Sequence, residues 1–325
     1  MILAGDVGGT KANLALLEDV PSRRFFKEGQ FLCKDYPNLE SILQTFLPKD
    51  VHIQAACLGI AGPIENNSCK ATNLPWIIQG SSIASVIGVP SVFLINDLEA
   101  NAWGIPLLRE EELYLVVPGE QSVPGNRALL SPGTGLGEAG IYFTGNAYIP
   151  FACEGGHVNF APRNEEEIEL LRFLRKRFGH VSYERVLSGQ GIVNIYDFFV
   201  HQHPESESKE VRERLLREDR AFVIHECAEN HQCCLCQRTM DLFFSICGAE
   251  AGNVALKFLA WGGLFLGGGI LPKNLKLFRK DLFMEAFLDK GRLASSLAKV
   301  KVEIILNPKT ALLGAGSYAM TLGKR

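Results

Sequence analysis

An Asn-Asp pair, Asn96-Asp97, follows a short apolar run that is typical of a buried strand. Residues 92–95 are β-branched, aromatic or leucine, with no polar residue that would mark a solvent-facing side. Open α/β sheets bind ligands at the carboxyl ends of their strands, so a carboxylate here is well placed for a site. Alternatively, Asp97 caps a helix that begins near Glu99, since strand-to-helix junctions often carry Asp. The pair alone leaves both interpretations open.

Two glycine-rich turns between apolar segments contain groups that can bind phosphate. They comprise Gly8, Gly9 and Thr10 in the first turn, and Gly133, Thr134 and Gly135 in the second. Glycine lets backbone N–H groups approach phosphate oxygens, and Asp6, just before the first turn, can hold Mg²⁺ through water. Neither turn is a Walker A loop or a dinucleotide loop that opens a helix. Each alone also fits an ordinary hairpin, whereas two facing turns would clamp the phosphates of a nucleotide.

Further candidates lie later in the chain. Gly268 and Gly269 follow an apolar run and would let an adenosine lie against the backbone, although close packing also explains them. Glu154 lies in an apolar, glycine-rich context where a structural carboxylate is hard to explain. A structural histidine remains an alternative for His157, and the first turn of a helix remains one for Glu184.

Six motifs occur in the order DVGGT, INDLEA, PGTGLG, EGGHVNFAP, ERVLSG and FLGGGI. With them the chain resembles the bacterial glucokinase family of the hexokinase and actin-like ATPase superfamily, from residue 2 to about residue 319. The zinc-bearing ROK relatives carry a cysteine-rich element soon after the histidine of the EGGH-like motif. Here HVNFAPRNEEE follows instead, so the resemblance is to the glucokinase branch without zinc.

The resemblance implies transfer of the γ-phosphoryl group of MgATP to the 6-hydroxyl of glucose, with ATP and Mg²⁺ required. It implies that Asp97 is the catalytic base and that the sugar is bound by Asn96, Asp97, Glu154, His157 and Glu184. ATP would be bound by Asp6, Gly8, Gly9, Thr10, Gly133, Thr134, Gly135, Gly268 and Gly269, with Asp6 also holding Mg²⁺ through water. Once these motifs are counted together, the base becomes the preferred interpretation of Asp97.

These roles agree with the chemistry of the reaction. Phosphoryl transfer needs positioning and charge neutralisation, and one group that orients the nucleophile. A sugar offers only hydroxyls, so a selective site needs several polar side chains, each matched to one hydroxyl. A kinase for mannose or an N-acetyl amino sugar remains an alternative, as does a sugar-binding regulator that has lost catalysis. Asp97 and the two turns argue against the regulator.

The chain departs from the family pattern at both turns. Lys11-Ala12-Asn13 stands where many members read Asn-Ala-Arg, and Lys11 adds positive charge near the phosphates. Ser131-Pro132 precedes the second turn, where a Gly-Ala type is more usual. The backbone contacts of both turns therefore have to come from the structure.

The elements that position these residues form a repeated pattern. Strand, Gly/Thr turn and strand occur twice, about 125 residues apart, and helices dominate from about residue 165 to 258. We expect an α/β protein with two actin-like (ribonuclease H-like) domains, mixed sheets flanked by helices, and an active-site cleft between them. The predicted ranges are 1–106 plus 308–325 for the smaller domain and 107–307 for the larger. Closure on the sugar would exclude water.

The bulk composition excludes several classes of partner. The formal charge of −3 over 325 residues argues against nucleic acid. The uncharged, glycine-rich stretch of residues 258–272 is shorter than the ~20 residues that span a bilayer, and the N-terminus does not read as a signal peptide. Nine scattered cysteines indicate a reduced, cytoplasmic protein, and Cys233, Cys234 and Cys236 indicate a cysteine-rich helix face rather than a zinc site. A homodimer is a family expectation.

Overall fold

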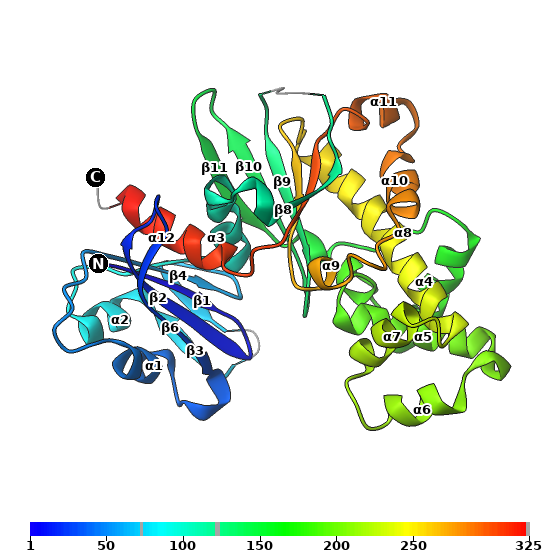
Figure 1. Ribbon diagram of the computed structural model, residues 1–325, viewed down its shortest axis with the longest axis horizontal. Coiled ribbons are helices and arrows are strands. Elements are labelled where there is room, and N and C mark those ends of the chain that lie inside the picture. The colour runs from blue at the N-terminus through cyan, green and yellow to red at the C-terminus, as the bar shows by residue number, and fades with distance from the viewer. Residues whose placement is uncertain (72–73, 121–123, 323–325) are drawn as a thin grey trace. The chain divides into compact units, whose positions relative to one another are not determined.

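The computed structural model describes residues 1–71, 74–120 and 124–322, which form two compact units (Figure 1). Unit 1 comprises Met1–Leu113, Ile149–Ala152 and Asn307–Arg325, and unit 2 comprises Tyr114–Tyr148 and Cys153–Leu306. The predicted domain ranges include residues 72–73, 121–123 and 323–325, which lie outside the described residues.

Unit 1 is built on a mixed five-stranded sheet in the order β3-β2-β1-β4-β7. Its strands are β1 (Ile2–Val7), β2 (Lys11–Asp19), β3 (Arg24–Leu32), β4 (Ala55–Ile60) and β7 (Phe93–Asn96). β1, β4 and β7 run parallel, whereas β2 is antiparallel to both β1 and β3. The sequence did not predict a separate ribbon that pairs β5 (Ser68–Lys70) with β6 (Ile77–Gln79).

Helices cover both faces of this sheet (Figure 1). They are α1 (Leu39–Phe46), α2 (Gly80–Ile87), α3 (Asp97–Gly104) and α12 (Thr310–Leu322), with 3₁₀ segments at Cys33–Asp35, Ile105–Leu107 and Glu110–Glu112. Successive strand residues point to opposite faces, so Leu3 and Leu14 pack with α1 and α2. Ala4 and Leu17 pack with α3 and α12. Most positions of the central strands β1 and β4 are buried, which explains their continuous apolar runs.

A six-stranded sheet in the order β11-β10-β9-β12-β13-β8 is formed mainly by unit 2, although Leu113 of β8 and Ile149–Ala152 of β11 belong to unit 1. The strands are β8 (Leu113–Val117), β9 (Arg127–Pro132), β10 (Leu136–Phe143), β11 (Tyr148–Cys153), β12 (Leu264–Leu266) and β13 (Val302–Ile305). β9 and β10 form an antiparallel hairpin, and β9, β12 and β13 run parallel. β1, β2, β4 and β7 have the same arrangement in unit 1, so the predicted duplication and α/β class are confirmed.

Helices make up most of the rest of unit 2, as predicted for residues 165–258. They are α4 (Glu165–Phe178), α5 (Gly189–Gln202), α6 (Lys209–Leu215), α7 (Arg220–Glu229), α8 (Cys234–Lys257), α9 (Ile270–Lys273), α10 (Lys280–Leu288) and α11 (Ala294–Leu297). Short 3₁₀ segments are η4 (Gly155–His157), η5 (Tyr183–Arg185), η6 (Pro204–Ser206) and η7 (Gly291–Leu293). The helices α9 to α11 were not predicted.

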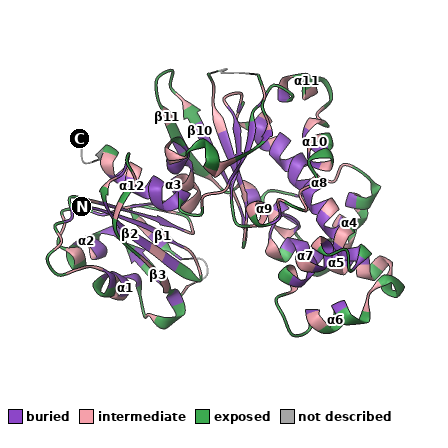
Figure 2. Cartoon of the chain, viewed as in Figure 1, coloured by how far each residue is buried: buried purple, intermediate pink, exposed green. Residues whose placement is uncertain are grey.

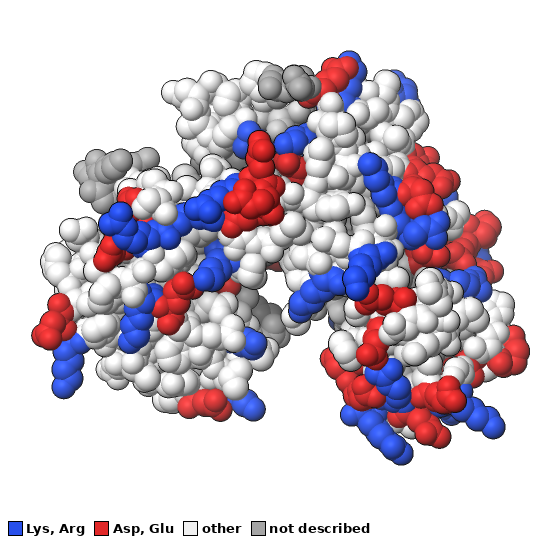
Figure 3. Space-filling model, in the orientation of Figure 1, with Lys and Arg blue, Asp and Glu red and all other residues white. Residues whose placement is uncertain are grey.

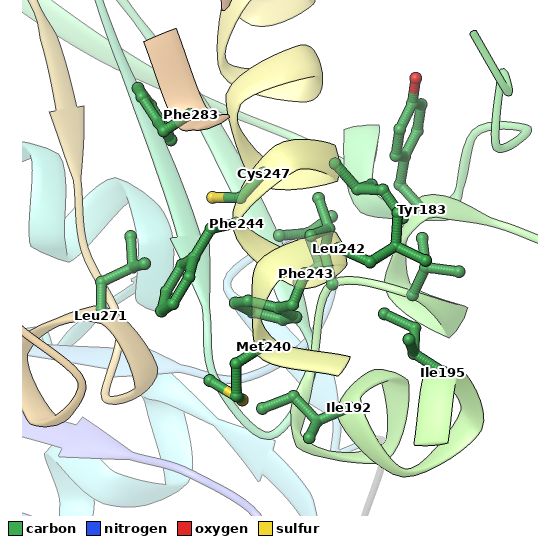
Figure 4. Packing of buried hydrophobic residues seen from close by; sticks show 14 of the residues in the cluster. Tyr183, Ile192, Ile195, Met240, Leu242, Phe243, Phe244, Cys247, Leu271 and Phe283 are labelled. Carbon is green, nitrogen blue, oxygen red and sulfur yellow. The ribbon is translucent and has the colours of Figure 1, made fainter. Parts of the chain in front are cut away.

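Helix α8 is the centre of the unit 2 core. It is buried over most of its length (Figure 2), because its apolar residues occupy all sides rather than one stripe. Figure 4 shows Phe243, Phe244 and Cys247 of α8 among side chains from other elements, including Tyr183 and Phe283. This packing holds η5 and α10 against one helix, which fixes the position of the segment that contains Glu184.

The surface follows the charge pattern of the sequence. The charged segment around α6 is largely exposed (Figure 2), and Figure 3 shows basic and acidic side chains intermixed on the face in view. Over the described ranges, no helix is both long and apolar enough to cross a membrane. All nine cysteines are free, and Cys233 lies at the N-cap of α8 with Cys236 one turn later. The described residues contain no group of three or more His, Cys, Asp or Glu suited to a metal ion.

Candidate active site

In unit 1, the candidate residues lie at one edge of the sheet. The parallel strands β1, β4 and β7 are in register, with Val7 opposite Ile60 and Ile60 opposite Asn96. The carboxyl ends of these three strands therefore meet, which brings Asp6 and the Asn96-Asp97 pair to the same edge. Two segments about 90 residues apart in the chain thus contribute to one surface.

The first glycine turn is the tight connection of the β1–β2 hairpin. The Gly8 N–H donates to the Lys11 carbonyl (2.9 Å), and the Cys33 N–H donates to the Thr10 carbonyl (2.9 Å). Thr10 is exposed, and Gly8 and Gly9 are partly exposed. The turn is thus a hairpin with an accessible outer edge, which is the geometry that a phosphate-binding turn needs.

Asp6 has a partner that sequence reasoning missed. Asn13, one of the departures from the family pattern, donates from Nδ2 to Asp6 Oδ2 (3.2 Å) and accepts from Gln30 Nε2 (2.9 Å). Burial raises the pKa of Asp6, and the hydrogen bond from Asn13 opposes that rise. Asn13 therefore orients the carboxylate, and the register of the hairpin, Asp6 opposite Asn13, was the signal that could have revealed it.

Asn96, rather than Asp97, caps the helix that follows β7. Its Oδ1 accepts from the Leu98 N–H (2.9 Å), and its Nδ2 donates to the Gly62 carbonyl (3.2 Å). Helix α3 begins at Asp97, two residues before the expected start at Glu99. Asp97 Oδ1 also accepts from the Leu98 N–H (3.0 Å), which fixes the orientation of this carboxylate on the first turn of the helix.

Gly59 is a second residue that sequence reasoning missed. A Cβ atom at this position would lie 2.8 Å from Ala100 Cβ and 3.7 Å from the Asp97 Cα. Only glycine therefore allows α3 to pack this closely on β4, and the position of Asp97 depends on that contact. The signal was present in the sequence as a glycine inside a strand, which often marks a close backbone approach.

In unit 2, the second glycine turn lies beside the third glycine cluster. The Gly133 N–H donates to the Gly135 carbonyl (2.8 Å), and Gly133 lies against the backbone nitrogen of Gly269, which a Cβ at Gly133 would approach to 4.0 Å. Gly268 has φ +76°, and a Cβ there would lie 2.2 Å from the Pro132 carbonyl oxygen. The two glycine clusters, predicted separately, therefore form one glycine-lined surface.

The same turn contacts the N-terminus of α5, which was not predicted. The Gly189 N–H donates to the Gly133 carbonyl (2.9 Å), and Ser188 caps the helix by accepting from the Gly191 N–H (3.0 Å). The positive end of this 14-residue helix therefore lies next to the turn. Such an end favours an anion nearby.

Glu184 contacts the second turn directly. Its Oε2 accepts from the Leu136 N–H (3.1 Å), and a Cβ at Gly135 would lie 2.5 Å from the same oxygen. Glu184 lies in η5. A candidate sugar-binding residue and a candidate phosphate-binding turn are therefore adjacent.

Glu154 precedes the η4 segment, His157 ends it, and the two side chains form a polar pair. His157 Nε2 lies 3.8 Å from Glu154 Oε2, and both side chains are mostly exposed, at 60% and 64% respectively. Gly156 packs on the Leu136 carbonyl, since a Cβ there would lie 2.1 Å from that oxygen. Leu136 thus lies between the two segments that hold the candidate sugar-binding residues, with its N–H on Glu184 and its carbonyl against η4.

Known proteins resemble this chain over nearly its whole length. The family model "Glucokinase" matches residues 3–322. A glucokinase from Trichormus variabilis is 38% identical over 340 residues, covering 99% of both chains. A glucokinase from Escherichia coli (strain HS) is 36% identical over 328 residues, covering 99% of this chain and 98% of the relative. The crystal structure of a glucokinase from an Antarctic psychrotroph matches with a TM-score of 0.84 at 30% identity and 98% coverage of both chains.

Proposed function

Because the chain belongs to the glucokinase family and is an ATP-dependent hexose kinase with an actin-like fold, we propose that it transfers the γ-phosphoryl group of MgATP to the 6-hydroxyl of glucose. The observation that carries this proposal is the convergence around Leu136 in unit 2. There the hydroxyl-binding candidates Glu154, His157 and Glu184 adjoin a glycine turn suited to phosphate. Sugar and nucleotide groups are the pair of ligands that this combination serves.

Asp97 is the proposed catalytic base. It would accept the proton of the 6-hydroxyl as that oxygen forms a bond to the γ-phosphorus. The bond between the γ-phosphorus and the bridging oxygen would break, and ADP would leave with that oxygen and the electron pair. The hydrogen bond from Leu98 to Oδ1 and the contact of α3 with Gly59 support a fixed orientation of the carboxylate.

Asn96 and the three unit 2 residues are the proposed sugar ligands. The side-chain oxygen Oδ1 of Asn96 already accepts the Leu98 N–H, and its second lone pair would accept a sugar hydroxyl. Glu154 and His157 are exposed and adjacent, so together they offer acceptors and a donor for neighbouring hydroxyls. Glu184 would use the carboxylate oxygen opposite the one bonded to Leu136.

The nucleotide would bind along the glycine turns. Gly8, Gly9 and Thr10 would contact phosphate in unit 1, Gly133, Thr134 and Gly135 would do so in unit 2, and the adenosine would lie beside Gly268 and Gly269. The residues present fit Mg²⁺, because Mg²⁺ keeps several waters and takes one or two carboxylates together with substrate phosphates. Asp6, held by Asn13, is the proposed carboxylate. The ion would neutralise phosphate charge.

The test measures ADP release with MgATP and a panel of hexoses for the wild type, Asp97→Asn and the control Asp19→Asn. Asp19 lies in the same unit at the end of β2, outside the candidate site, and accepts a hydrogen bond from Ser22. We expect turnover with glucose, a loss of about 10²- to 10⁴-fold in kcat for Asp97→Asn with glucose still bound, and wild-type activity for the control.

Other outcomes would change the proposal in defined ways. Turnover only with mannose or an N-acetyl amino sugar would keep the mechanism and replace the substrate. Sugar binding without ADP release from the wild type would indicate a sugar-binding regulator. Full activity of Asp97→Asn would remove Asp97 as the base.

We also propose that the protein works as a cytoplasmic homodimer. Seven of the nine free cysteines are buried, which supports a reducing compartment. Light scattering at the exit of a size-exclusion column measures the mass directly, and a single-chain mass would refute the dimer.

A further inference from the structure

A buried cluster of polar side chains lies beneath the sugar-binding segments of unit 2. Glu138 of β10 is 1% exposed and Glu250 of α8 is fully buried. Lys257 donates to Glu250 Oε1 (2.8 Å). Asn253 donates to Glu250 Oε2 (2.8 Å) and to the Tyr183 hydroxyl (3.0 Å). The cluster therefore connects β10 and α8 with η5.

Glu138 also contacts η4. A Cβ at Gly155 would lie 1.9 Å from Glu138 Oε2, so the carboxyl group lies directly against the backbone between Glu154 and Gly156. The Cys153 thiol donates to the Glu138 carbonyl (3.5 Å). One end of the cluster thus supports Glu154–His157, and the other end supports Tyr183, the residue before Glu184.

Glu138 and Glu250 face each other beside a single lysine, Lys257. If both carboxyl groups ionise, one negative charge in the cluster has no positive partner. Glu138 Oε1 is buried without a hydrogen-bond partner among the described residues, which is costly for an ionised carboxylate. Burial, and then the charge of Glu250, raise the pKa of Glu138 to about 8, with Lys257 opposing the rise. At neutral pH Glu138 therefore keeps a proton, which it donates to Glu250.

We propose that the Glu138–Glu250 pair positions the two segments that carry Glu154, His157 and Glu184. This inference rests on the sugar-binding roles proposed above. Neither carboxyl group touches the sugar. The pair acts through Gly155 on one side and, by way of Asn253, through Tyr183 on the other. While the proton is shared, the two carboxyl groups attract each other and both segments stay in place.

Titratable side chains from several elements surround the Glu138–Glu250 pair. The titratable groups that face it are Lys257 and Cys247 of α8, Tyr183 of η5, Cys153 of β11, and Lys290. Burial raises the pKa of both thiols, so they stay neutral at pH values where Glu138 begins to ionise. Loss of the proton then places a second negative charge in the cluster, and the carboxylates repel each other.

The test compares the glucose KM of the wild type, Glu138→Gln and a control across pH. Glutamine has the shape of a protonated glutamate and donates to Glu250, but it cannot ionise. Glu303→Gln is the control, since Glu303 is a buried glutamate of β13 in the same sheet and pairs with Lys301. Glu250→Gln is a second variant, which removes the other charge of the pair.

In the wild type and in Glu303→Gln, we expect the glucose KM to rise about tenfold between about pH 7 and about pH 9, since the competent protonated fraction falls to about a tenth. In Glu138→Gln and Glu250→Gln the rise should be less than about twofold, with the neutral-pH KM preserved in Glu138→Gln. A merely structural role would not produce a pH dependence that the isosteric amide removes.

Equal pH profiles for the wild type and Glu138→Gln, both active on glucose, would overturn this inference and leave the proposed function intact. A wild type that phosphorylates another hexose would change the proposed function, and the same comparison would then be made with that hexose. A wild type that phosphorylates no hexose would overturn both.

Discussion

Replacing Gly59 with alanine should displace Asp97, the proposed catalytic base, by moving helix α3. The new Cβ would lie 2.8 Å from Ala100 Cβ, and both atoms are attached to regular backbone, one on β4 and one on α3. Neither can rotate away, because a Cβ has no side-chain torsion. The strand is buried between neighbours on both sides, so the helix has to move.

The size of the movement follows from this distance. Ordinary van der Waals contacts begin at 3.4 Å, so α3 must move by at least 0.6 Å at Ala100, one turn from Asp97. A misplacement of about 1 Å costs about 100-fold in rate, so we expect Gly59→Ala to lower kcat by about 10- to 100-fold. Overpacking should also lower the free energy of unfolding by about 1–3 kcal/mol.

A double variant distinguishes displacement from general damage. Adding Ala100→Gly removes the clashing atom and leaves the new Cβ at 3.6 Å from the Gly5 carbonyl and 3.7 Å from the Asp97 Cα. The kcat of Gly59→Ala/Ala100→Gly should return to that of the control Ala100→Gly, which alone costs about 1 kcal/mol of stability. Steady-state ADP release and urea denaturation measure both quantities. A wild-type kcat for Gly59→Ala, or no recovery in the double variant, would refute the reasoning.

Three further outcomes follow from single positions. Gly268→Ala combines φ +76° with a backbone clash, so the KM for ATP should rise at least about tenfold; Gly145→Ala, strained at φ +101° in open space, should leave it unchanged. Glu112→Gln breaks a bidentate ion pair with the mostly buried Arg23, whose Nη2 donates to Glu112 Oε1 (2.7 Å). It should lower the free energy of unfolding, measured in urea, by about 1–3 kcal/mol, whereas Glu111→Gln, which removes an exposed ion pair, should not. The raised pKa of Glu138, about 8 against 4.5, means that the native state holds a proton that the unfolded chain releases. The wild type should therefore lose stability relative to Glu138→Gln from about pH 5 to about pH 8 and no further; a constant difference across that range would contradict it.

Local patterns predicted most of the elements around the site. The β1–β2 and β9–β10 hairpins follow from apolar runs that flank Gly/Thr turns, and α4 follows from its period and its terminal glycine. The segments missed are short and depend on distant partners. The three-residue strands β5 and β6 have too few residues to show alternation, and β11 is formed by pairing with β10.

The candidate residues were identified by type, but their neighbours were not. The Asn-Asp pair was read correctly as the end of a strand, but the only helix cap that the sequence suggested was Asp97. The cap is Asn96, because its side chain reaches both Leu98 and Gly62. Gly268 and Gly133 belong to separate motifs in the sequence. The parallel pairing of β12 with β9 brings the two glycine clusters together in the structure.

The sequence by itself determined the types of chemical group, their order and the family, because these depend on residues close together in the chain. Only the tertiary structure decided which groups touch. Three contacts join residues on different elements: the hydrogen bond from Asn13 to Asp6, the packing of Ala100 on Gly59, and the packing of Glu138 on Gly155. Such contacts depend on strand register and on helix packing, where a shift of one residue turns a side chain to the opposite face.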